Sequence, residues 1–374
     1  MIRLLHTADV HLGRQFPSLR NKAGEYRNQL LRTFEKVVDL AVTEDVSLLL
    51  IAGDLFDTNR VHGLTIGKVL TAFRKLETSG IRVCIIPGTH DAYSEDSLYR
   101  SLRFPQNVTV FTPEQSQQTY EDLDLTVYGM VPESKSWGKS PLQGLSLTQK
   151  SEFHIGMVHC SIKHSGIIET DGMILDREEI TSSGLDYLAL GHWHSFQEFS
   201  QGNTKACYSG SPEPMDMDQK GAGNVVLVTL KERGRVEIQP IRVGTRKCES
   251  ITIDVTPLES IDSIAKTIES KADPNLILEV TLTGLSAMDY DLSCHEIENM
   301  LAGEFFHLRV VDRSHPKLEE VKSQNYPEKT VVGRFLRIMD ERIGAASTQE
   351  DKSLYEEALK LGFTLLQGRS QVIE

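Results

Sequence analysis

The sequence has few cysteines, and their spacing argues against two kinds of scaffold. The five cysteines are scattered, odd in number and form no Cys-x-x-Cys pair. This arrangement argues against a disulfide framework and against a zinc site made of thiolates. We therefore expect a reducing compartment, of which the cytoplasm is the simplest.

Long hydrophobic runs are absent as well. No run of about 18 apolar residues occurs, so the sequence predicts no transmembrane helix and no membrane partner. The short apolar stretch at the start meets His6 and Asp9 at once and lacks a small-residue cleavage site. We therefore do not expect a signal peptide.

Basic residues are in the minority. The 40 Lys and Arg residues stand against 53 Asp and Glu residues, which gives a net charge of −13. A free-standing DNA-binding domain usually has the opposite sign. Two routes to nucleic acid stay open, because metal ions can offset clustered carboxylates and a partner can supply a basic surface. The chain also lacks a P-loop motif, so we do not expect it to be a P-loop ATPase itself.

Strand and helix patterns alternate in the first half of the chain, which predicts an α/β fold. Apolar runs occupy residues 2–9, 47–54 and 82–88, and helical patterns occupy residues 25–44 and 65–78. From residue 108 onward the predicted strands lie closer together. The combination favours an α+β sandwich, with a mixed sheet or two mixed β-sheets flanked by helices.

Changes of pattern along the chain predict three parts. The sandwich occupies residues 1–245, a small α+β domain occupies residues 246–318, and two amphipathic helices lie within residues 325–374. A polar segment separates the last two parts, as a linker does. The apolar faces of the two helices either pack on the chain's own core or bind a partner. They are formed by Val331, Phe335, Ile338 and Met339 in one helix and by Leu354, Ala358, Leu361 and Leu365 in the other.

Five clusters of Asp and His residues follow predicted strands. In chain order they are Asp9-Val10-His11, Gly53-Asp54-Leu55-Phe56-Asp57, Gly88-Thr89-His90-Asp91, His159 and Gly191-His192-Trp193-His194. Because ligands bind outside the carboxyl ends of strands in open α/β sheets, we expect these side chains to converge. Carboxylates can bridge two cations and imidazoles supply neutral donors. A set of nitrogen and oxygen donors without sulfur favours Mn, Fe or Zn over Ca.

Each cluster taken alone also has a simpler interpretation. Asp9 can be an N-cap beside a surface histidine, Asp54 can belong to a turn, and His159 can be an ordinary strand histidine. His192 and His194 are a stronger signal, because residues two apart point to the same side of an extended segment. The succession of all five, each after a strand, favours one shared metal centre.

The succession DVH, GDLFD, GTHD, VH and GHWH resembles the calcineurin-like metallophosphoesterase superfamily. The flanking stretches LLHTADVHLG, LIAGDLFDTN and YSGSPEP resemble the SbcD group of DNA repair exonuclease subunits, especially its YhaO-like branch. The likeness covers residues 1–240 well and is looser over the α+β segment, which resembles the family's capping domain. It implies a metallophosphoesterase nuclease domain at residues 1–245 and a capping domain at residues 246–318.

The resemblance implies two divalent metal ions, with Mn expected first and Fe or Zn as the alternatives. Matched motif by motif, Asp9, His11 and His194 would bind the first ion, His159 and His192 the second, and Asp54 would bridge both. His90 takes the place of the family's catalytic histidine, and Asp91 that of the residue that orients it.

Thr89 departs from the family pattern, which reads Gly-Asn-His-Asp or Gly-Asn-His-Glu where this chain has Gly-Thr-His-Asp. The family's asparagine lends a carbonyl oxygen to the second metal. A threonine hydroxyl is shorter and a poorer donor. Three outcomes are open: water takes the place of the amide oxygen, Thr89 ligates the metal directly, or the second site binds weakly.

The resemblance implies that the substrate is DNA and that the chain acts on it as an exonuclease. It leaves open an additional endonuclease activity. The partner would be an SbcC-like coiled-coil ATPase that binds the C-terminal helices, and the chain would form a homodimer. Basic residues beside the motifs are candidates for DNA backbone contacts, with ordinary solvated charge as the alternative. They are Arg14, Arg20, Lys22, Arg27, Arg60 and Lys163.

Two other functions compete with this hypothesis. The chain could be a phosphodiesterase for small phosphoesters, although a small substrate needs no additional α+β domain. It could instead be a degenerate, non-cleaving scaffold that binds DNA ends, with its second metal site spoiled by Thr89.

Overall fold

A computed structural model describes most of the chain, in two compact units, Met1–Lys247 and Cys248–Glu374. The described residues are 1–131, 140–147, 149–163, 173–217, 219–258, 260–286, 294–316 and 326–366. The further division of the second unit into a capping domain and a helical part stays a prediction. Among the described helices, none has the length and apolar character that crossing a membrane requires.

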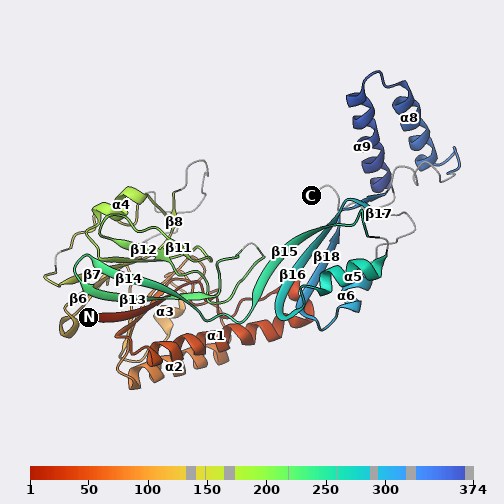
Figure 1. Cartoon of the computed structure of the whole chain (residues 1–374). Coiled ribbons are helices and arrows are strands. Elements are labelled where there is room, and N and C mark those ends of the chain that lie inside the picture. Colours follow the sequence, from red (N-terminus) through yellow and green to blue (C-terminus); the bar gives the residue numbers. More distant parts are fainter. Residues whose placement is uncertain are drawn as a thin grey trace. The chain divides into compact units, whose positions relative to one another are not determined.

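Two six-stranded mixed sheets form the first unit, as expected for an α+β sandwich (Figure 1). The first has the order β14-β13-β1-β2-β3-β4 and the second the order β11-β12-β10-β7-β6-β5. The first sheet comprises β1 (Ile2–Thr7), β2 (Leu48–Ala52), β3 (Arg82–Ile86), β4 (Val108–Val110), β13 (Asn224–Glu232) and β14 (Arg235–Arg242). The second comprises β5 (Gln117–Tyr120), β6 (Leu125–Met130), β7 (Phe153–His159), β10 (Tyr187–Gly191), β11 (Gln197–Glu198) and β12 (Lys205–Tyr208).

Each sheet contains four neighbouring strands that run parallel to one another. β1, β2, β3 and β4 run parallel, and so do β6, β7, β10 and β12. β13 joins β1 in the antiparallel sense, which makes the first sheet mixed. Because parallel strands end at the same edge of a sheet, the loops that follow them can contribute side chains to one site.

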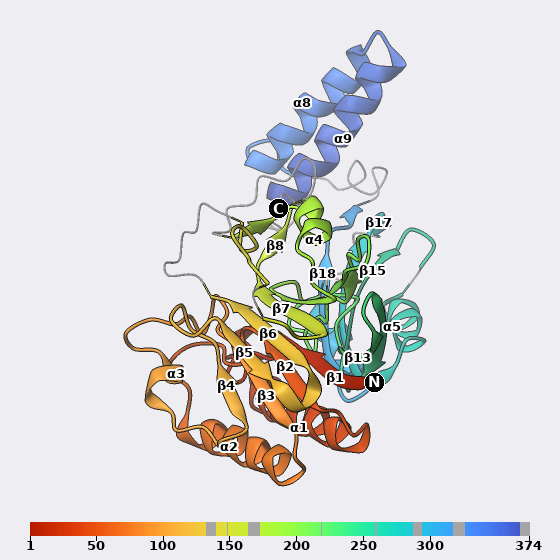
Figure 2. The same cartoon turned by 90° about the vertical axis from the view of Figure 1, so that its left-hand side faces the viewer.

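The core lies between the two sheets. Leu4, Leu50 and Cys84 of the first sheet belong to one buried cluster with Ile155 and Ala189 of the second. All five residues of β2 are buried, which explains its unbroken apolar sequence LLLIA. The helices α1 (Ala23–Thr43) and α2 (Gly63–Thr78) lie beside the first sheet in both views (Figures 1 and 2).

Short elements complete the first unit. They are the 3-10 helices η1 (Pro17–Lys22) and η2 (Glu121–Leu123), the helices α3 (Leu98–Ser101) and α4 (Arg177–Ser182), and the strands β8 (Ser161–Ile162) and β9 (Ile174–Leu175). The first of these helices, η1, leads directly into α1.

The second unit has its own core. A three-stranded sheet of β15 (Lys247–Asp254), β16 (Asp273–Thr283) and β18 (Phe305–Asp312) packs with α5 (Ile261–Glu269) and α6 (Cys294–Met300) around shared apolar residues. The short strands β17 (Leu285–Ser286) and β19 (His315–Pro316) pair with each other. Together these elements bury a core that is built without residues of the first unit.

The last two helices, α8 (Val331–Ala345) and α9 (Gln349–Leu366), pack on each other. Their contact is made by Met339, Ile343, Leu359 and Phe363. Met339 and Phe335, which the helical pattern placed on one apolar face with Val331 and Ile338, are therefore part of the contact between the helices. Six large apolar side chains on the described part of the pair stay exposed: Val331, Ile338, Leu354, Leu361, Leu365 and Leu366.

Candidate metal centre

Asp and His side chains from four strand ends converge at one edge of the sandwich. Asp9 and His11 follow β1, Asp54 follows β2, His159 ends β7, and His194 lies beyond β10. Among the described residues, three groups of donors arise: Asp9 with His11 and His194, Asp9 with Asp54 and His159, and His11 with Asp57 and His90. Within each group the donor atoms lie within 4.8 Å of one another. Because the first two groups share Asp9, they are adjacent, as a pair of metal sites requires.

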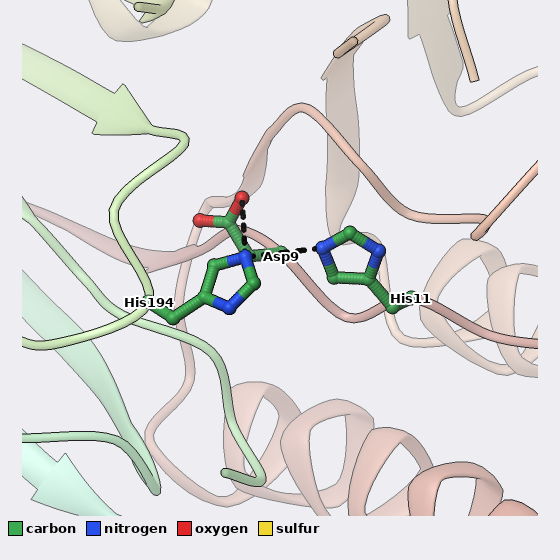
Figure 3. A group of neighbouring side chains, drawn as sticks. All are labelled: Asp9, His11 and His194. Atoms are coloured by element: carbon green, nitrogen blue, oxygen red, sulfur yellow. Dashed lines mark hydrogen bonds and ion pairs between the residues drawn. The ribbon is translucent and has the colours of Figure 1, made fainter. Parts of the chain in front are cut away.

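In the first group, one ring nitrogen of His194 lies close to both Asp9 and His11 (Figure 3). Its two Nε2 atoms, of His11 and His194, lie 3.2 Å apart, and His194 Nε2 lies 3.9 Å from Asp9 Oδ1. Nitrogen donors that each sit about 2.1 Å from one ion are roughly 3 Å from each other, so this spacing fits a common cation. Asp9 and His11 are fully buried, which keeps competing water away from them.

The second group contains a buried nitrogen whose hydrogen-bonding capacity is unused. His159 Nε2 lies 3.2 Å from Asp54 Oδ2, yet it has no hydrogen-bond partner among the described residues. Buried polar atoms without a partner are rare in folded proteins and call for an explanation. A cation held by this nitrogen and the neighbouring carboxylate would satisfy both, so the residues present fit a divalent metal.

Hydrogen bonds at Nδ1 of His159 and His11 set the tautomer in which the other ring nitrogen, Nε2, can bind a metal ion. His159 Nδ1 donates to the carbonyl oxygen of Ala52 at 2.9 Å, and His11 Nδ1 donates to Asp57 Oδ1 at 3.2 Å. A ring that donates through Nδ1 keeps a lone pair on Nε2, the atom that faces the site. Sequence reasoning did not assign these roles to Ala52 and Asp57.

The charges of the second group also indicate a site for a cation. Burial alone raises the pKa of Asp54, but attraction to His159 and His11 outweighs it and holds the pKa well below its usual value. Burial lowers the pKa of His159, whereas Asp54 and Asp9 raise it, and the result is a pKa of about 10. A divalent ion would supply the positive charge that a proton on His159 otherwise provides.

Asp91 holds a loop in place, where we had expected it to orient His90. Its buried carboxylate accepts hydrogen bonds from Gly88 N at 2.7 Å, Phe56 N at 3.0 Å and Tyr99 Oη at 2.6 Å. Burial, together with repulsion from Asp54, raises the pKa of Asp91 to about 6. These partners join the loops after β2 and β3, and none of the described contacts of Asp91 involves the His90 ring.

His90 itself is oriented by Asp57. Its Nδ1 donates to the carbonyl oxygen of Asp57 at 3.1 Å, and the Asp57 carboxylate lies 3.8 Å from the same nitrogen. The side chain is 47% exposed, so it can meet a ligand from solution. Its backbone N–H donates to Asp54 Oδ1 at 2.8 Å, which ties this loop to the candidate metal ligands.

Thr89 and His192 lie at the rim of the centre. Thr89 is exposed, and its Oγ1 donates to Asp54 Oδ2 at 3.4 Å, a long hydrogen bond. The backbone N–H of His192 donates to both carboxylate oxygens of Asp9, at 3.0 and 3.1 Å. The His192 ring lies edge-on to His159 with centroids 5.3 Å apart, and its nitrogens are outside the donor groups found among the described residues.

Most of the basic residues considered for DNA contact have acidic or polar neighbours. Arg14 pairs with Asp216 at 3.2 Å, Lys22 with Glu25 at 3.2 Å, and Lys163 with Asp176 at 3.4 Å. Arg27 donates to Gln15 at 3.4 Å. Arg20 and Arg60 are exposed. Burial is the largest influence on the pKa of His194 and lowers it. The positive charge of Arg14 lowers the same pKa further, which indicates that Arg14 lies near the centre.

A pair of mixed sheets with Asp and His donors gathered at their shared edge defines a metal-dependent phosphoester hydrolase. A family model described as calcineurin-like phosphoesterase matches residues 2–196. The chain therefore belongs to the calcineurin-like phosphoesterase family and is a metal-dependent phosphodiesterase.

Several known proteins are similar to this chain. It is 25% identical over 278 residues to the uncharacterized metallophosphoesterase YhaO of Bacillus subtilis. The aligned residues make up 72% of this chain and 67% of that protein. It is 26% identical over 218 residues to the DNA double-strand break repair protein Mre11 of Saccharolobus solfataricus. The aligned residues make up 58% of this chain and 55% of that protein. A dimetal phosphatase from Danio rerio is 14% identical, with a TM-score of 0.40 and coverage of 65% of this chain and 99% of that one.

Replacing Gly191 with alanine tests the close packing behind the centre. An added Cβ would lie 1.8 Å from the carbonyl oxygen of Ala52 and 2.8 Å from His159 Nδ1. We expect the free energy of unfolding of the metal-free protein to fall by about 3 kcal/mol, because the backbone of β10 would have to move away from β2. Urea unfolding followed by circular dichroism measures this change.

Gly67→Ala is the matched control for this substitution. A Cβ on Gly67, within α2, meets nothing within 4 Å. This control should keep or raise stability, by up to about 1 kcal/mol, because alanine favours helix. Equal stability of the two variants would contradict the importance of the Gly191 contact.

Proposed function

We propose that this protein hydrolyses phosphodiester bonds in DNA at a two-metal centre and acts as an SbcD-like exonuclease in DNA repair. The observation that carries the proposal is the pair of donor groups that share the buried Asp9. Similarity to a double-strand break repair protein supports DNA as the substrate. The described second unit, which lies beyond the matched family model, provides additional surface that a small phosphoester would not need.

Two divalent ions, with Mn first and Fe or Zn as alternatives, are the cofactors in this proposal. The first ion would be held by Asp9, His11 and His194, and the second by His159 and His192, with Asp54 shared by both. Of these ligands, Asp54 and His159 lie in one donor group with Asp9, whereas His192 lies outside the groups found among the described residues. When bound, such an ion pair polarises phosphate oxygens and makes water a nucleophile near neutral pH. The chain's own contribution is to hold the ligand atoms in a buried and rigid arrangement.

His90 is the residue proposed to act on the substrate. Its Nδ1–H is engaged by the carbonyl oxygen of Asp57, so Nε2 is the atom available to a phosphate or a leaving oxygen. A histidine in this position can stabilise the developing charge or deliver a proton to the leaving group. Asp57 is a positioning residue, because it acts on the substrate only through the ring of His90.

Replacing His90 with alanine is the main test of this function. We expect turnover of linear duplex DNA with Mn²⁺ to fall by about 10²–10⁴-fold, which is the usual contribution of a general acid or base. Metal content measured by elemental analysis should not change. The exposed His295, in α6 of the second unit, gives a control variant, His295→Ala, that should keep full activity.

Four results, one with His90→Ala and three with the wild-type protein, count against the proposal. DNA turnover that persists in His90→Ala would reject the role of His90. Wild-type protein that binds no transition metal, or that cleaves DNA equally well after chelation, would reject the two-metal centre. Cleavage of bis-p-nitrophenyl phosphate without any cleavage of duplex DNA would favour the alternative of a phosphodiesterase for small phosphoesters.

Thr89→Asn separates the nuclease from a non-cleaving DNA-end-binding scaffold. The Thr89 hydroxyl already contacts Asp54, so an asparagine at this position of a working nuclease should change turnover little. Initial rates on linear duplex DNA at saturating Mn²⁺ measure the effect. A much larger gain would show that the wild-type second site is defective. Thr267→Asn, on the exposed side of α5, controls for the substitution itself.

We further propose an SbcC-like coiled-coil ATPase as the partner. In the α8–α9 pair, Val331 and Ile338 are seven residues apart, as are Leu354 and Leu361, so each pair lies on one side of its helix. All four are exposed. Such stripes are typical of helices that bind another helix. A partner would also supply basic surface that a chain of net charge −13 lacks. Homodimer formation and a cytoplasmic location complete the proposal.

Substituting Leu354 and Leu361 together with glutamate tests the partner site without removing the helices. Co-expression with the SbcC-like ATPase of the same genome should give a complex with the wild-type chain, whereas the double variant should lose it. The reason is that charge on the stripe removes apolar burial at the interface. Lys352→Gln with Ser353→Glu adds the same negative charge to exposed positions of α9 and should leave the complex intact. Equal recovery with all three chains would reject this docking site.

A further inference from the structure

Gln219 binds His194, one of the two histidines of the first donor group. Its Nε2 donates to His194 Nδ1 at 2.7 Å. Its Oε1 accepts the backbone N–H of Met215, also at 2.7 Å. Because a backbone N–H can only donate, the oxygen of the amide must face Met215 and the nitrogen must face His194. The Gln219 side chain is therefore fixed in one orientation.

This orientation sets the tautomer of His194. A neutral imidazole that accepts at Nδ1 carries its hydrogen on Nε2. His194 Nε2 lies 3.2 Å from His11 Nε2, and His11 already donates through Nδ1 to Asp57. His194 Nε2–H can therefore donate to the lone pair of His11. In this arrangement the two nitrogens that face the first site bind each other.

His194 thus differs from the other two histidines. His11 and His159 both donate through Nδ1, to Asp57 and to Ala52, and keep Nε2 as a ligand atom. For His194 to present a lone pair at Nε2, its hydrogen must move to Nδ1, where it meets the amide N–H of Gln219. Turning the amide over would solve this conflict but would place the amide N–H against the backbone N–H of Met215, a buried residue.

We propose that Gln219 is a positioning residue that weakens the first cation site by holding His194 in the tautomer that cannot bind a metal ion through Nε2. This inference rests on the proposed two-metal function and names a residue that controls its metal affinity. An ion that enters between Asp9, His11 and His194 must break the hydrogen bond of Gln219 to either His194 or Met215. Occupancy of the first site then requires a higher metal concentration than its donor set alone would need.

Gln219→Glu is the substitution that tests the proposal. A carboxylate in the same place can accept from Met215 N–H and from His194 Nδ1–H at the same time, which leaves Nε2 as a ligand atom. We expect one of the two Mn²⁺ binding steps, measured by titration calorimetry on the full chain, to tighten by about 10–100-fold, the usual effect of such outer partners. Gln117→Glu, at an exposed position of β5, adds the same charge and should leave both steps unchanged.

A second measurement reads the tautomer directly and needs no metal. Long-range ¹⁵N–¹H spectra of the metal-free protein should show His194 protonated at Nε2 in the wild type and at Nδ1 in Gln219→Glu. The His194 signals are identified by their loss in His194→Ala. An Nδ1–H tautomer in the wild type would overturn the proposal even if the variant did not fold.

The outcomes separate this inference from the function on which it rests. Wild-type protein that binds Mn²⁺ while Gln219→Glu binds it no more tightly would overturn the role of Gln219 and leave the two-metal centre standing. Wild-type protein that binds no Mn²⁺ would reject the two-metal centre, and the tautomer spectra would then decide on the contact between Gln219 and His194.

Discussion

The close approach of β2 and β10 is the contact on which the metal centre depends. Gly191 has no side chain, and a Cβ there would overlap the carbonyl oxygen of Ala52. The same oxygen accepts the Nδ1–H of His159. One backbone group therefore limits the distance between the two sheets and fixes the tautomer of a candidate ligand. Donors from both sheets can share Asp9 only because the sheets meet this closely.

Strained backbone accompanies this arrangement. Asp9, His11 and Asp54 have φ values of 53°, 49° and 49°, and His192 has a φ of 103°. Side chains other than glycine seldom adopt this region, and each such residue costs of order 1–3 kcal/mol. The surrounding core and the hydrogen bonds to Asp9 and Asp54 stabilise these conformations. Four strained residues in one centre indicate that the position of each donor outweighs its local preference.

The sequence predicted the two mixed sheets and the place of the five clusters, because strand periodicity and the strand-to-loop transitions are local signals. It did not predict which residue orients His90. Asp91 is adjacent in the chain, but the neighbour in space is Asp57, from a different loop. Gln219 was missed for the same reason, since it reaches His194 from a loop that carries no motif. Contacts between loops depend on how the sheets pack, and no local pattern encodes them.

Charge explains how an acidic chain could act on DNA in the proposed function. Neighbouring groups hold the pKa of the buried Asp54 below its usual value, so this side chain stays a carboxylate that can bind a cation. Arg14, Lys22 and Lys163 are already paired with acidic residues, and a phosphate would have to displace those partners. Attraction of DNA would then come mainly from the bound ions and from a partner's basic surface. Control of metal occupancy at His194 would in that case control substrate binding as well as catalysis.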